Sequence, residues 1–135
     1  MELRKKTTMI VVHCAATKAS MDIGATEIKK WHVDDNGWDD IGYHYIIKRG
    51  GLVEVGRPEG FQGAHAPAAN SKSIGICLVG GMADDGGAEN NFTMEQFLSL
   101  KDLIKRLVMT NSNIKEIVGH CDIQDNKPNC PGFNL

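Results

Sequence analysis

The sequence contains no long apolar run and carries little net charge. No segment approaches the roughly 18 consecutive apolar residues of a membrane-spanning helix, and the first residues, MELRKKTT, lack the apolar stretch and cleavage site of a signal peptide. With 15 Lys and Arg against 17 Asp and Glu, the formal charge of -2 gives no general attraction to nucleic acid or to an anionic membrane. We therefore expect a protein made in the cytoplasm that binds neither.

Cysteines are also few, and no paired CxxC or HExxH motif is present. The four cysteines, Cys14, Cys77, Cys121 and Cys130, are far apart in a sequence without secretion signals, so thiol or metal roles are favoured over disulfides. Internal repeats and linkers are absent. A chain of 135 residues with 41% hydrophobic content fits one compact core. We expect a single domain spanning residues 1–135, and a monomer.

The hydrophobic pattern predicts both strands and helices. Two β-branched apolar runs are typical of buried strands, and an alternating segment that reaches Gly50-Gly51 predicts an antiparallel hairpin. Thr93 and Gln96 fit a capping box at the start of the longest helix. The expected strands cover 8–14, 43–48, 52–56, 73–81 and 114–118, and the expected helices cover 24–33 and 93–109. The fold class is therefore α/β, with a central mixed β-sheet flanked by helices.

Three residues at the ends of elements form a candidate metal site. His13 ends the first strand, His120 follows the last strand, and Cys130 precedes Pro131 in the C-terminal segment. Two imidazoles and one thiolate, without an evident fourth protein ligand, match a catalytic zinc site that keeps one position open. Strand ends of this kind commonly border a surface cleft. The alternative for a lone His13 is a core histidine bonded to a backbone carbonyl.

Neighbouring residues are assigned by alternation along extended backbone. Cys14 and Cys121 directly follow the two histidines and should point away from the metal, as buried thiols. Alternation also places Tyr43 and Tyr45 on one face of their strand and His44 on the other. We expect His44 to hold a neighbouring element through a backbone hydrogen bond. On spacing alone, Tyr43 is a half-buried aromatic with its hydroxyl in water.

Short blocks along nearly the whole chain resemble a known family. In order, they are VVHCAATK (11–18), EIKKWH (27–32), GYHYIIKR (42–49), GAHA (63–66), SIGICLVGG (73–81), NFT (91–93), GH (119–120) and CPGF (130–133). They are similar to the zinc-dependent N-acetylmuramoyl-L-alanine amidases of T7-like phage lysozyme and of peptidoglycan recognition proteins. The resemblance implies Zn²⁺ as cofactor, held by His13, His120 and Cys130, and Tyr43 as a catalytic residue.

The resemblance implies two further site residues. Phage members of the family place a catalytic lysine two residues before the cysteine ligand, where this chain has Pro128. Lys127, one residue earlier, is the expected replacement. His65, in the long loop of residues 57–70, corresponds to a position that lines the substrate groove; the alternative is an exposed loop histidine.

The implied reaction is hydrolysis of the amide between N-acetylmuramic acid and L-alanine in bacterial peptidoglycan. It would serve endolysin-like lysis or wall remodelling, after release through a separate permeabilising partner. One alternative is a peptidoglycan-binding module without activity, but such members usually lose the cysteine ligand, and Cys130 is present. Another is a regulator of a second enzyme with a structural zinc, although a structural site normally has four protein ligands and three are found.

Overall fold

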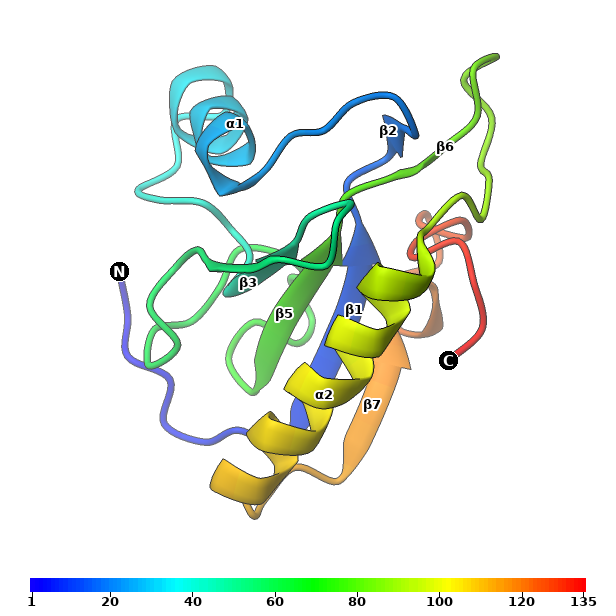
Figure 1. The fold of residues 1–135 in the computed structure, drawn as a ribbon. Coiled ribbons are helices and arrows are strands. Elements are labelled where there is room, and N and C mark those ends of the chain that lie inside the picture. The colour runs from blue at the N-terminus through cyan, green and yellow to red at the C-terminus, as the bar shows by residue number, and fades with distance from the viewer.

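A five-stranded mixed sheet forms the centre of the computed structural model, which describes residues 1–135 (Figure 1). Four strands run parallel, and one edge strand pairs antiparallel with its neighbour. In spatial order they are β4 (Val53–Val55), β3 (Tyr45–Ile47), β5 (Ser73–Leu78), β1 (Met9–Cys14) and β7 (Glu116–Gly119). The predicted α/β class, the mixed sheet and the hairpin of residues 43–56 are confirmed.

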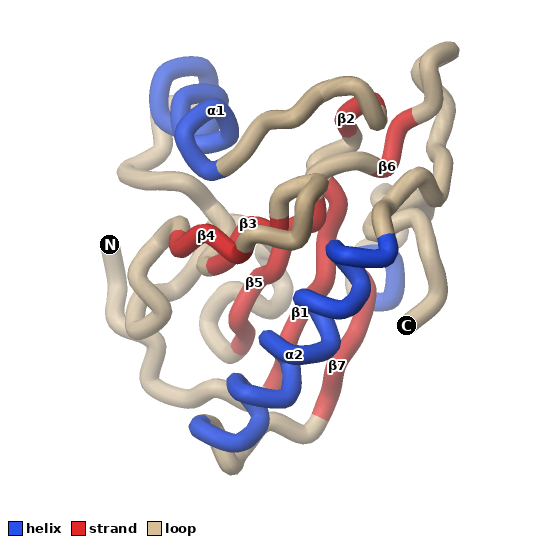
Figure 2. The backbone as a smooth tube through the Cα atoms, viewed as in Figure 1, coloured by secondary structure: helices blue, strands red, loops and turns tan.

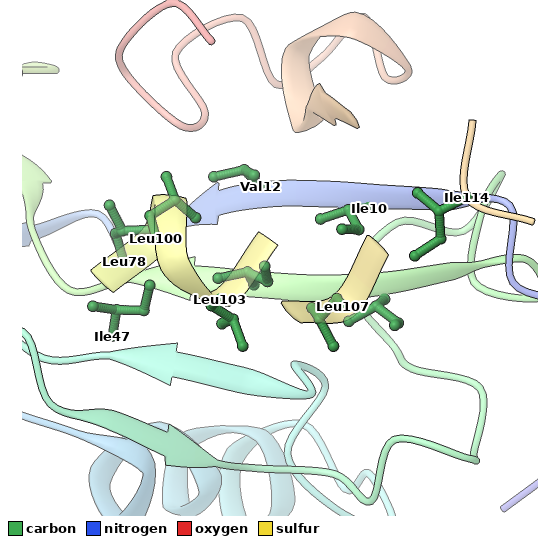
Figure 3. Close-up of a cluster of buried hydrophobic side chains, with 10 residues drawn as sticks. Ile10, Val12, Ile47, Leu78, Leu100, Leu103, Leu107 and Ile114 are labelled. Atoms are coloured by element: carbon green, nitrogen blue, oxygen red, sulfur yellow. The ribbon is translucent and has the colours of Figure 1, made fainter. Parts of the chain in front are cut away.

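Helix α2 (Met94–Thr110) covers one face of this sheet. Its Leu100, Leu103 and Leu107 recur every three or four residues and pack on alternate side chains of the strands, such as Ile10 and Val12 (Figure 3). Every residue of β1 and β5 is buried, as the continuous apolar runs predict. The predicted capping box is also confirmed, because the Thr93 side chain accepts from the Gln96 backbone and the Gln96 side chain accepts in return.

The opposite face is covered by a short helix and a long loop. Helix α1 (Ala25–Lys30) continues into a π-helical turn, Trp31–Asp35, and buries Ile28 against the sheet. Farther along the same face, Ala66 and Ala69 of the loop between β4 and β5 pack on Met9 and Val11. Figure 2 shows how much of this side consists of loop. The sheet is therefore flanked by helices, but on this face a loop supplies part of the cover.

Three local features differ from the predictions. A two-stranded sheet of β2 (Thr17–Lys18) and β6 (Gly81–Met82) was not predicted, because two-residue strands leave no hydrophobic pattern. The strand predicted to reach residue 81 ends at residue 78, before two glycines with positive φ. The shared face of Tyr43 and Tyr45 is wrong. Because β3 begins only at Tyr45, Tyr43 lies outside the alternation and packs with the α1 cluster, whereas Tyr45 packs with the α2 cluster.

The parallel strands all direct their carboxyl ends toward one edge of the sheet, which the C-terminal segment also reaches (Figure 1). A 3₁₀ turn, His120–Asp122, follows β7 directly at this edge. No helix of the structure combines the length and the apolar character needed to cross a bilayer.

Candidate metal centre and cleft

His13, His120 and Cys130 meet at the carboxyl edge of the sheet. The Nδ1 atoms of His13 and His120 lie 3.0 Å apart, and Cys130 Sγ lies 3.9 Å from His13 Nδ1. One ligand atom from each of the three residues lies within 4.8 Å of the other two. His13 and His120 are buried and Cys130 is partly exposed, so the cluster opens toward solvent on the side of the C-terminal segment.

The spacing and chemistry of these atoms suit a zinc ion. In a tetrahedral zinc site, two ligand nitrogens lie about 3.3 Å apart, and a nitrogen and a sulfur about 3.6 Å apart. Burial lowers the pKa of both histidines, which favours the neutral, metal-binding imidazole. The neighbouring Cys14 thiol and burial raise the pKa of Cys130, so its thiolate form needs a cation beside it. The three side chains therefore fit the group that the sequence predicts.

Backbone and side-chain contacts hold the candidate ligands in place. The Cys14 backbone N–H points at Cys130 Sγ over 3.3 Å, and the Cys121 N–H donates to the Cys130 carbonyl over 2.8 Å. On the far side of the His120 ring, Nε2 contacts Gln124 Oε1. Gln124 carried no signal in the sequence, because its role depends on the 3₁₀ turn that brings it next to the histidine.

Tyr43 lies beside the cluster. Its ring centroid is 5.1 Å from that of His13, and its other side packs on His32, which accepts a hydrogen bond from the Gly42 N–H over 2.8 Å. Burial raises the pKa of Tyr43 well above its usual value, and the nearby thiols of Cys77, Cys130 and Cys14 make a smaller contribution in the same direction. The phenol therefore stays protonated at neutral pH and can donate a hydrogen bond.

A cleft of about 450 Å³ lies over the cluster. Its walls come from the loop after β1, the segment from β6 through residue 88, and the C-terminal segment. The lining residues are Cys14, Ala15, Ala16, Tyr43, Gly81, Met82, Gly86, Gly87, Ala88, His120, Asn126, Lys127, Pro128, Asn129 and Cys130. The wall at residues 81–88 was not predicted, because that loop has no chemical motif and reaches the cleft only through β6.

Lys127 and Pro128 both lie in the wall of this cleft, and Lys127 is exposed to solvent. The positive charge of Lys127 is one of the smaller causes that lower the pKa of His13 and His120, after burial. Lys127 thus presents its charge to the same cleft as Tyr43, His120 and Cys130.

His65 is not on the cleft wall. Its side chain is buried, 7% exposed, behind His13, and His65 Nδ1 lies 2.8 Å from His13 Nε2. The loop of residues 57–72 turns inward here to cover the sheet, so neither the expected groove position nor the alternative of an exposed loop histidine describes it.

Two other expectations have clear outcomes. His44 links neighbouring elements as expected: its Nδ1 accepts from the Gly75 N–H over 2.9 Å, and its Nε2 lies 2.8 Å from the Phe61 carbonyl. Cys14 is a buried thiol as expected, but it does not point away from the cluster, because it lines the cleft beside the Cys130 thiol. Cys121 is partly exposed because it belongs to the 3₁₀ turn rather than to the strand.

Comparisons with known proteins identify the family of this chain. The family model described as N-acetylmuramoyl-L-alanine amidase matches residues 3–133. The chain belongs to this family. Within the amidase family, it is 44% identical to the endolysin of Escherichia phage T7 and 43% identical to that of Klebsiella phage KP32, in each case over 98% of this chain and 85% of the relative.

Two solved structures share the fold of this chain. An endolysin amidase, LysCS from Clostridium intestinale, superposes with a TM-score of 0.84 at 31% identity, over 98% of this chain and 80% of that chain. Drosophila PGRP-LB gives a TM-score of 0.80 at 26% identity, over 98% and 78% of the two chains. The family resemblance seen in the sequence blocks is therefore confirmed.

The cysteine assignment can be tested by substitution. We expect Cys130→Ser to weaken zinc binding strongly, because it replaces a thiolate ligand with a hydroxyl that does not ionise at neutral pH. Cys121→Ser, the matched control at a partly exposed thiol, should retain one zinc per chain. Metal content after dialysis and competition with a chromophoric chelator would measure both. Equal loss of zinc from the two variants would show that the ligands are assigned wrongly.

Proposed function

We propose that this chain is a zinc-dependent N-acetylmuramoyl-L-alanine amidase that cleaves the amide between N-acetylmuramic acid and L-alanine in bacterial peptidoglycan. The observation that carries the proposal is the open cluster of His13, His120 and Cys130 beneath a cleft that also holds Tyr43 and Lys127. The substrate class is inferred from the chain's membership of the amidase family and from its sequence identity with phage endolysins over nearly its whole length. The wall of a bacterium is therefore the proposed site of action.

The cluster supplies three protein ligands and leaves the cleft side open. Zinc held there would provide a Lewis acid for the scissile carbonyl and would lower the pKa of a water molecule toward ~7. No Asp or Glu lines the cleft, so no carboxylate there can act as the general base of an HExxH protease. We assign the proton transfers to solvent in the cleft, with Tyr43 as a hydrogen-bond donor beside it.

Tyr43 is suited to stabilising the tetrahedral transition state. Because its pKa is raised, the hydroxyl keeps its proton and can donate to the oxygen on which negative charge develops. Its packing between His13 and His32 holds the ring, so the donor needs little reorganisation during the reaction. Tyr43 therefore contributes mainly to the transition state rather than to substrate binding.

Lys127 supplies positive charge from the C-terminal wall. It lines the cleft with Tyr43 and His120, and an ammonium at this position favours a developing oxyanion over the neutral amide. Because the side chain is solvent-exposed, its effect should be smaller than that of the half-buried Tyr43.

Digestion of purified peptidoglycan followed by mass analysis tests the reaction. We expect free stem peptides that begin with L-alanine, and loss of their release when zinc is chelated and recovery when zinc is restored. New reducing sugar ends would instead indicate a glycosidase. Retention of the protein on peptidoglycan without release of peptides would indicate a binding module and would contradict the proposal.

Tyr43→Phe should lower kcat on a soluble muramyl peptide by about 10²- to 10³-fold, the usual effect of removing one oxyanion donor. KM and zinc content should change little. The matched control is Tyr45→Phe, which removes a hydroxyl bonded to Glu59 on the other face of the sheet. A full rate in Tyr43→Phe would exclude the hydroxyl from the mechanism.

Lys127→Ala should lower kcat by about 5- to 10-fold, as expected for one exposed charge near the reacting group. Zinc content should stay at one per chain, because the lysine is not a ligand. Lys115→Ala, at the amino end of β7 and so at the far edge of the sheet, is the control. Identical rates for the two variants would show that the shifted lysine does not take part.

A further inference from the structure

His65 is held in a narrow slot behind His13. A Cβ atom added to Gly63 would lie 2.5 Å from His65 Cδ2, and one added to Gly75 would lie 2.6 Å from His65 Cγ, so only glycine fits on either side of the ring. The backbone is held as well, because the N–H groups of His65 and Ala66 donate to Asn70 Oδ1 over 3.0 and 2.9 Å. The loop therefore fixes both the position and the plane of this imidazole.

Ser73 determines which nitrogen of His65 carries the proton. Ser73 Oγ lies 2.7 Å from the Ala69 carbonyl and 3.3 Å from His65 Nε2. A carbonyl oxygen can only accept, so the single hydroxyl proton is committed to Ala69. The hydroxyl can then only accept from His65, which places the N–H of His65 at Nε2 and leaves its Nδ1 as an acceptor.

The same reasoning assigns the protonated nitrogen of His13. His65 Nδ1 lies 2.8 Å from His13 Nε2, and the two rings meet edge to face at 90°. Because His65 Nδ1 accepts, His13 must donate from Nε2, and a neutral ring has no second N–H. The lone pair of His13 is therefore at Nδ1, the atom that faces His120 and Cys130.

His120 is oriented in the same way by a different residue. Its Nε2 contacts Gln124 Oε1, an acceptor, so its lone pair is also at Nδ1. Two Nδ1 lone pairs thus face each other over 3.0 Å with no proton assigned between them. A cation between the two nitrogens is the arrangement that makes this approach favourable.

We propose that Ser73 and His65 are positioning residues that hold His13 in the tautomer required for metal binding. This inference rests on the metal centre proposed above. A hydrogen-bond partner of this kind is general for metal-binding histidines, and its loss weakens metal affinity by about 10- to 100-fold. In this chain the partner is a second histidine, itself oriented by a serine hydroxyl at the start of β5.

The hydrogen bonds that run from Ser73 through His65 to His13 are called the relay here. Zinc affinity, measured by competition with a chromophoric chelator, tests the relay without relying on activity. Ser73→Ala and His65→Phe should bind zinc about 10- to 100-fold more weakly than the unmodified protein. His65→Asn, whose side-chain oxygen can accept in place of Nδ1, should recover most of the affinity. Ser99→Ala is the matched control, because it also removes one serine bond to a carbonyl but lies on α2.

Thermal unfolding of each metal-free variant shows that it is folded, and ¹⁵N NMR of its histidine rings reads the tautomer directly. The metal-free unmodified protein should carry the His13 proton on Nε2, and Ser73→Ala should populate the Nδ1–H form. If Ser73→Ala and His65→Phe bind zinc as tightly as Ser99→Ala, or if the unmodified protein carries this proton on Nδ1, the relay is refuted. An unmodified protein with the Nε2–H form but without zinc affinity would refute the proposed metal centre instead.

Discussion

The site depends on the parallel pairing of β1 with β7 and β5. The register places Val12 opposite Gly119, so the residues that follow them, His13 in β1 and His120 at the start of the 3₁₀ turn, lie at the same edge. A shift of β1 by one residue would exchange its two buried faces and turn His13 into the apolar layer under α2, where an imidazole would lack its hydrogen-bond partners. The close approach of the two imidazoles is therefore set by the core rather than by any local motif.

This dependence explains how much could be predicted. Continuous apolar runs identify β1 and β5, so the α/β class followed from the sequence, although the end of β5 was placed three residues too late. The two histidines proposed as metal ligands were found from their places near the carboxyl ends of β1 and β7. The face of Tyr43 could not be predicted in the same way, because alternation holds only inside a strand and the chain bends before Tyr45. The small sheet of β2 and β6 is held by tertiary contacts over two residues on each side, which leave no periodic pattern.

The position of His65 shows a different limit. Loop histidines are usually exposed, and a groove position was the functional alternative. His65 is buried because this loop covers the sheet where a helix would otherwise do so. Ala66 and Ala69 pack on the strands, and Asn70 accepts the backbone hydrogen bonds that close the turn. Gly75, in the middle of β5, then has a specific meaning, since the missing side chain is the space that the imidazole occupies. A glycine in a buried strand predicts a close approach, but not which group approaches.

The C-terminal segment joins the site through its backbone as well as through its thiol. The Cys130 carbonyl accepts from the Cys121 N–H, and the Cys14 N–H points at the sulfur, so the thiol proposed as the third ligand is oriented by contacts that need no metal. Preorganisation of this kind would lower the conformational cost of binding a metal ion, whereas the two facing imidazole nitrogens and the ionised form of the partly exposed Cys130 thiol are unfavourable without a cation. The fold thus supplies the geometry of the candidate centre, and an ion bound there would stabilise the charges of its side chains.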